Sequence, residues 1–161
     1  MNTSIEKYFD RMIENLKNKQ KLLIEMSDLT QAQAGVIKSD TLPVLQKLID
    51  EKQIRIDAID KLDEEFSVYM GRLKSTAGVN SLEELDVSTY PAAAQLKGIT
   101  TEILGLIKKI SEIEKLNSSK SKELLNELGG EIKKINQGKK VNKAYSPGPV
   151  SLPSYFVDKK K

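Results

Sequence analysis

The sequence contains no cysteine and no histidine among its 161 residues. Without cysteine, the chain cannot form a disulfide or a thiolate metal site. Without histidine, it lacks the commonest general base and metal ligand, and no Ser-His-Asp or Cys-His apparatus can be assembled. An enzyme would have to rely on carboxylates and lysines alone. We therefore expect no enzymatic activity, no cofactor and no bound metal.

Long apolar segments are also missing. The first residues, MNTSIEKYFDRM, are polar and lack the apolar core of a signal peptide. No apolar run approaches the roughly 20 residues that a membrane-spanning helix needs. We therefore expect a cytoplasmic protein without membrane insertion.

Aromatic residues make up only 5% of the chain, whereas 30% of the residues are charged. Few aromatics together with abundant Leu, Ile, Lys and Glu favour long amphipathic helices. Apolar residues recur at steps of three and four in residues 3–38 and again in residues 42–74. This heptad-like spacing predicts two long helices rather than strands.

A tight turn is expected between these two helices. Asp40 or Thr41 can cap the second helix, and Pro43 suits its first turn. Because the turn is short, the two helices must run antiparallel. Their aromatic residues then meet at the end away from the turn.

A connector at residues 75–90 leads to a third helix that begins near Tyr90-Pro91. Within the connector, Ser81 and Glu84 have the spacing of a capping box. The third helix is predicted over residues 91–117, and residues 118–137 form either its continuation or a separate amphipathic helix. The expected apolar stripe consists of Leu96, Ile99, Ile103, Leu106, Ile110 and Ile113.

These patterns predict an all-α fold, an elongated antiparallel helical hairpin with a third long helix. The three-helix, coiled-coil-like bundle covers residues 1–137, and a flexible Lys/Pro-rich tail covers 138–161. The net charge is +3, but the tail holds six lysines and one aspartate, so it carries +5 and the rest of the chain −2. The folded part therefore lacks the basic face typical of nucleic-acid binders, and we expect no specific nucleic-acid partner.

Three charged residues fall on the apolar stripes: Lys19 in the first helix, and Lys52 and Asp63 in the second. They indicate either a buried polar network that sets the helix register or side chains that snorkel to water at the bundle edge. Snorkelling is the commoner behaviour of long charged side chains, and we favour it.

The segment Leu124–Ile135 is amphipathic but interrupted by Gly129 and Gly130, each of which costs about 1 kcal/mol in a helix relative to alanine. Its apolar residues are candidates for binding a partner helix: Leu124, Leu125, Leu128, Ile132 and Ile135. The alternative is a frayed end of the bundle.

The whole pattern resembles the FlgN family of flagellar type III export chaperones. The resemblance rests on a long hairpin with Asp40 at its turn, on Asn117 ahead of Leu124-Leu125, and on a tail that ends in Phe156-Val157-Asp158. It implies a cytoplasmic chaperone for hook–filament junction proteins of the FlgK/FlgL type. It further implies client binding by the C-terminal helical segment and delivery to the export gate.

The resemblance further implies that a tyrosine beyond the client helix, Tyr145, docks the export-gate component FlhA. Tyr155 and Phe156 form a second apolar point in the tail, and we expect both points either to dock the export gate or to fold back on the bundle. The sequence leaves open whether the protein is a monomer or a dimer.

Two other functions fit the sequence. A generic coiled-coil adaptor would self-associate through its heptad faces and depend on Leu96, Ile103 and Ile110. A binder of nucleic acid or membrane surfaces would use the lysine-rich tail, with an affinity that falls as salt rises.

Overall fold

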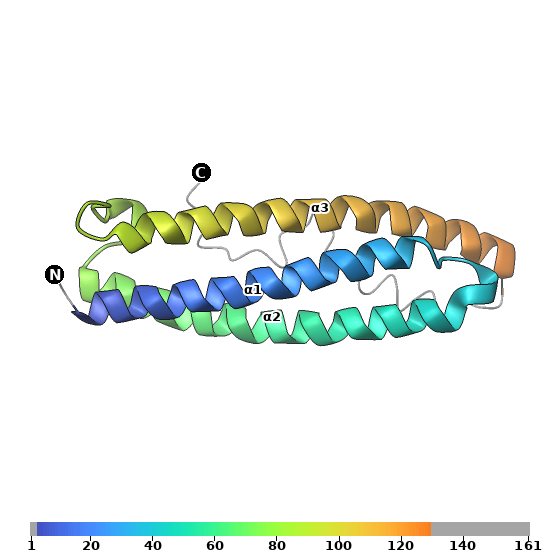
Figure 1. Ribbon diagram of the computed structural model, residues 1–161, viewed down its shortest axis with the longest axis horizontal. Helices are drawn as coiled ribbons and strands as arrows, with labels where there is room; N and C mark the ends of the chain where they lie inside the picture. Colours follow the sequence, from blue (N-terminus) through green and yellow to red (C-terminus); the bar gives the residue numbers. More distant parts are fainter. Residues whose placement is uncertain (1–2, 130–161) are drawn as a thin grey trace.

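The computed structural model describes residues 3–129 of the chain. Its long helices are α1 (Thr3–Ala34), α2 (Leu42–Ala77) and α3 (Pro91–Leu128), and the connectors hold the 3₁₀ helices η1 (Ser39–Thr41) and η2 (Leu82–Glu84). The long helices lie side by side in an elongated bundle. α1 and α3 run in the same direction and α2 runs against both (Figure 1). The predicted all-α class, a hairpin with a third long helix, is confirmed.

The turn between α1 and α2 begins earlier than predicted, because α1 ends at Ala34 rather than at residue 38. Gly35 follows at once, and glycine is a poor helix former. Thr41 occupies the N-cap position of α2, but its hydroxyl donates to the carbonyl oxygen of Val36 at 2.8 Å. No side chain caps α2, so that part of the prediction was wrong, whereas Pro43 lies in the first turn as expected.

The second connector is anchored at Gly78 and again at η2. Gly78 ends α2 with a φ of +69°, a left-handed conformation that glycine adopts without strain. The predicted capping box is present, and Oε2 of Glu84 accepts a hydrogen bond from the amide of Ser81 at 2.8 Å. Leu82, inside this turn, is fully buried. The connector therefore packs onto the bundle and directs the chain into α3.

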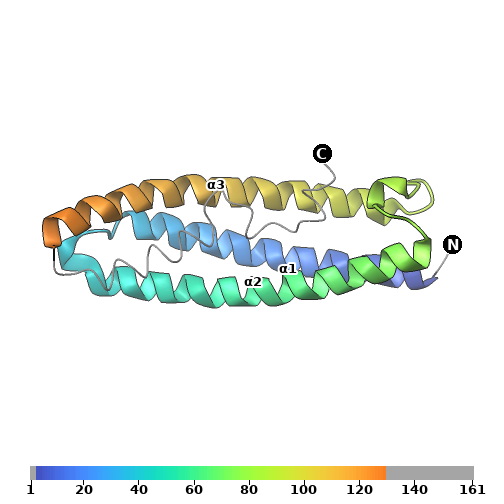
Figure 2. The same cartoon turned by 180° about the vertical axis from the view of Figure 1, so that it is seen from behind.

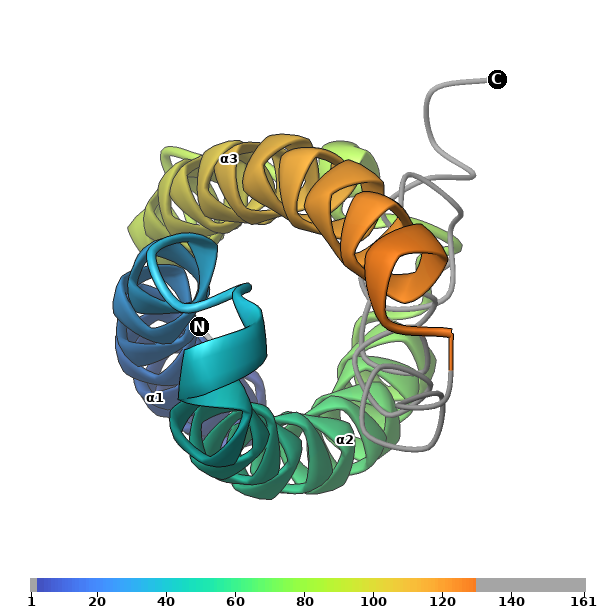
Figure 3. The ribbon, with the colours of Figure 1, turned by 90° about the vertical axis from the view of Figure 1, so that its right-hand side faces the viewer.

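α1 is the helix that the other two share. It packs along both α2 and α3, whereas α2 and α3 make very few close backbone approaches to each other. Seen along the bundle axis, the helices wind around one another, which is the supercoil expected of a heptad-like repeat (Figure 3). The rings of Tyr8 and Tyr69 lie 6.3 Å apart at the end away from η1, as predicted for the aromatic residues.

α3 is continuous through residues 118–128, so this stretch continues the third helix and is not a separate one. It ends beside the η1 turn (Figure 2). The predicted stripe holds at Leu96, Ile99, Ile103 and Ile110, but Ile107 and Glu114 are buried where Leu106 and Ile113 were expected. A strict heptad count drifts on a helix of 3.6 residues per turn, and the drift explains the shift. The predicted tail, residues 138–161, lies outside the described residues.

Candidate functional site

A layer of buried polar side chains crosses the bundle near the η1 end. Thr30 and Gln33 come from α1, Lys52 from α2, and Glu114 and Asn117 from α3, and each is at most 1% exposed. We call these five residues the polar layer. Each occupies a position on the buried stripe of its helix where the repeat calls for an apolar residue.

The polar layer is bonded across all three helices. Nζ of Lys52 forms an ion pair with Oε1 of Glu114 and donates a hydrogen bond to Oε1 of Gln33 at 3.0 Å. Oγ1 of Thr30 lies 3.3 Å from the same glutamate oxygen. Nδ2 of Asn117 donates to the carbonyl oxygen of Thr30 at 3.1 Å. These bonds fix the axial position of α3 against α1 and α2.

The layer is only partly satisfied. Oε2 of Glu114, Oδ1 of Asn117 and Oγ of nearby Ser111 are buried and have no hydrogen-bond partner among residues 3–129. An unpaired buried polar group costs about 1–3 kcal/mol. Burial also lowers the pKa of Lys52 to about 7, because the ammonium group has lost its water. The layer therefore gives α3 a specific register at the expense of stability.

A second buried lysine lies on α1, closer to the start of that helix than the polar layer. Nζ of Lys19 is 2.7 Å from Oδ1 of Asp63, and this pair joins α1 to α2 only. Burial raises the pKa of Asp63, and the positive charge of Lys19 opposes that shift. Lys19 and Lys52 are both fully buried, so the prediction that they snorkel at the bundle edge was wrong. The alternative of a buried network describes them correctly.

The predicted client-binding residues on α3 lie beside the η1 turn. Leu124 is 5% exposed, while Leu125 and Leu128 are half-buried and pack against the core. The remaining predicted site residues lie outside the described part of the chain: Ile132, Ile135, Tyr145, Tyr155 and Phe156. The α3 leucines thus cover the bundle rather than forming a free surface.

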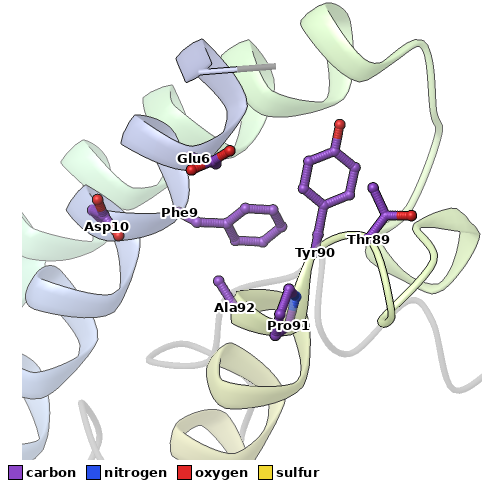
Figure 4. A pocket seen from close by; sticks show the side chains of 7 residues that line it. All are labelled: Glu6, Phe9, Asp10, Thr89, Tyr90, Pro91 and Ala92. Carbon is purple, nitrogen blue, oxygen red and sulfur yellow. The ribbon is translucent and has the colours of Figure 1, made fainter. Parts of the chain in front are cut away.

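A surface pocket of about 280 Å³ lies at the opposite end, between the starts of α1 and α3. Figure 4 shows the ring of Phe9 beside that of Tyr90, with the carboxylates of Glu6 and Asp10 at the α1 side. The two ring centroids are 6.1 Å apart. Because both carboxylates are solvent exposed, a cation would keep most of its water there. We assign this pocket no ligand.

The comparison with protein families decides the class of this protein. A model of the FlgN family, described as FlgN protein, matches residues 1–148. The chain belongs to the FlgN family. Membership gives this FlgN-family protein a general role as a flagellar export chaperone, and the family is one of chaperones rather than enzymes. No curated protein and no solved structure matches the chain. Within residues 3–129, no helix is long and apolar enough to cross a membrane.

Sequence reasoning found part of the polar layer. Thr30, Gln33, Lys52 and Asn117 stand where the three-and-four spacing of the sequence calls for an apolar residue, and that interruption of the stripe was the available signal. Glu114 was missed because the heptad count placed Ile113 on the stripe. The pairing of Lys52 with a residue 62 positions away has no local signature.

Proposed function

We propose that this FlgN-family protein is a cytoplasmic export chaperone for hook–filament junction proteins of the FlgK/FlgL type. It binds the client through the C-terminal part of α3 and delivers it to the flagellar type III export gate. The observation that carries the proposal is the family match over residues 1–148, which includes all of α3. The end of α3 carries apolar residues of the kind that such a partner needs, although in the bundle they pack against the core.

Leu124, Leu125 and Leu128 form the described part of the proposed client site, and Ile132 and Ile135 extend it beyond the described residues. The three leucines fall on one face of α3, at helical spacing. An apolar surface of this kind suits a helical segment of the client. Binding requires no chemistry, in keeping with a chain that has neither cysteine nor histidine.

Tyr145, Tyr155 and Phe156 are the proposed contacts with the export gate. They follow the client site in the sequence, in a stretch that also holds Pro147, Pro149 and Pro153. We therefore expect truncation after Gly138 to weaken delivery while the melting temperature of the bundle stays the same. A large fall in melting temperature would instead show that these aromatics belong to the core.

Client binding is tested by calorimetry with a purified junction protein. Leu125→Ala/Leu128→Ala should weaken binding about tenfold or more, since apolar anchors dominate such interfaces. Leu116→Ala is the matched control, because Leu116 lies on the same helix but is 64% exposed. The proposal fails if the wild-type chain binds no junction protein, or if the control weakens binding as much as the double variant.

The adaptor alternative gains no support from the structure. Leu96, Ile103 and Ile110, on which self-association was expected to depend, are at most 3% exposed inside a single chain. Their apolar surface is already used within the bundle. Sedimentation at several protein concentrations tests for self-association, and a stable oligomer would support the adaptor function.

A further inference from the structure

The surface that α3 buries changes character along its length. Between Pro91 and Ile110 every buried residue is apolar: Ala93, Leu96, Ile99, Ile103, Ile107 and Ile110. Beyond that point the buried residues are Ser111, Glu114, Asn117 and Ser121, with Leu124 alone as a buried apolar residue. We call residues 114–128 the α3 end. Its attachment depends on polar bonds far more than that of the first half of the helix.

These polar bonds cost less to open than apolar contacts do. When the α3 end separates, Lys52 and Glu114 regain water, which repays much of the energy of their ion pair. Glu114 Oε2 and Asn117 Oδ1, which have no hydrogen-bond partner within the described part of the closed bundle, gain one in water. A further hydrogen bond near η1, from Nζ of Lys120 to the carbonyl oxygen of Ala34 at 3.2 Å, is exposed.

The arrangement of the helices lets the α3 end separate on its own. α3 packs on α1 and hardly approaches the backbone of α2. The hairpin of α1 and α2 keeps its own contacts, including the pair of Lys19 with Asp63. Separation therefore leaves both the hairpin and the apolar first half of α3 in place.

We propose that the polar layer is a release point, at which the α3 end detaches and frees its leucines for the client. The proposal rests on the proposed function in one respect, the identity of the partner. Leu124 is 5% exposed in the closed bundle, so a client helix that is to contact it needs the α3 end to open first. The partner is then an amphipathic helix that meets leucines on a newly exposed face.

Hydrogen exchange of the full chain tests the release without any client. Backbone amides of residues 114–128 should exchange at least about tenfold faster than those of residues 93–110, because local opening is cheaper there. Uniform protection along α3 would overturn the proposal.

Two double variants make the test specific. Lys52→Met/Glu114→Leu replaces the buried pair by apolar side chains, which commonly stabilises a protein, and should slow exchange of the α3 end about tenfold. Lys19→Met/Asp63→Leu is the matched control, because it removes a buried pair that does not involve α3 and should leave that exchange unchanged. Equal effects of the two variants would contradict a release point at the polar layer.

Folding is checked by circular dichroism, and Glu114→Gln provides a second route. It keeps the shape of the side chain but removes its charge, so exchange of residues 114–128 should quicken while residues 93–110 stay protected. Unchanged exchange in this variant would also count against the proposal.

The client experiment separates this inference from the proposed function. The Lys52→Met/Glu114→Leu variant should bind the junction protein about tenfold more weakly. Binding needs the open α3 end, and this variant makes the open state about tenfold rarer. Wild-type affinity in a variant with slowed exchange would overturn the link between release and binding. Failure of every variant to bind a junction protein would remove the proposed function, whereas the exchange result would stand by itself.

Discussion

The ammonium nitrogen of Lys19 lies 2.7 Å from Oδ1 of Asp63, although Lys19 is 1% exposed and Asp63 is 28% exposed. The lysine is thus buried in the interface of α1 with α2, and its partner lies at the edge of that interface. The carboxylate lets a charged group stay inside the bundle.

Removal of the carboxylate should therefore be costly. Asp63→Ala leaves the buried ammonium group without its partner, and we expect a loss of about 2 kcal/mol in the free energy of unfolding, lower than for a wholly buried pair. Urea denaturation measures the change. Glu64→Ala, at an exposed neighbouring position, should alter stability by less than about 0.5 kcal/mol. Equal effects at both positions would mean that the ion pair contributes nothing.

The lowered pKa of Lys52 predicts a dependence of stability on pH. In the folded chain the pKa is about 7, against a normal 10.5, so between these values the unfolded chain binds more protons. The free energy of unfolding contributed by this residue then rises as the pH rises from about 7 to about 10. Denaturation across this pH range gives the free energies of unfolding of wild type and of Lys52→Met/Glu114→Leu. As the pH rises, the free energy of unfolding of wild type should increase relative to that of the variant. A constant difference would show that Lys52 does not titrate there.

Two glycines in α3 offer a stabilising change. Gly98 and Gly105 are exposed, and an added Cβ at either would meet nothing within 4 Å. Gly98→Ala/Gly105→Ala should raise the free energy of unfolding by about 1–2 kcal/mol, since glycine costs nearly 1 kcal/mol in a helix interior. Thermal denaturation provides the measurement. A loss of stability would instead indicate that these glycines pack closely against a second chain.

The anchor of the second connector can be tested at Leu82. Leu82→Ala should lower the free energy of unfolding by about 2–4 kcal/mol, because it leaves a cavity at a fully buried site. Ser81→Ala removes only one half of the capping box and should cost about 1 kcal/mol. If both changes cost the same, the leucine is not the main anchor of the connector.

Most of the fold could be predicted from the sequence because apolar periodicity encodes which face of each helix is buried. The three-and-four spacing predicted over residues 42–74 matches the residues that α2 buries, from Leu45 through Ile59 to Phe66, and the capping box at Ser81 was also predicted correctly. The prediction overlooked Gly35, a poor helix former, and therefore placed the end of α1 four residues too late, at 38 instead of 34.

The polar layer could be predicted only in part. Lys52 was recognised as a charged residue on an apolar stripe, but its burial depends on Glu114, which lies on another helix. Snorkelling is the better general guess for a lysine with no known partner. A partner 62 residues away becomes visible only when α3 is placed against α2.

The position of α1 between its two neighbours has a consequence for the variation that this protein tolerates. Twelve of its 32 residues are buried, compared with nine of 36 in α2, because α1 faces two helices at once. The buried positions of α1 must fit against two helices, whereas positions on the outer surface of α2 or α3 fit against none. In a library of random variants selected for folding, α1 should therefore retain its residues most strictly, and the sequence of the protein should diverge fastest on the outer faces of its neighbours.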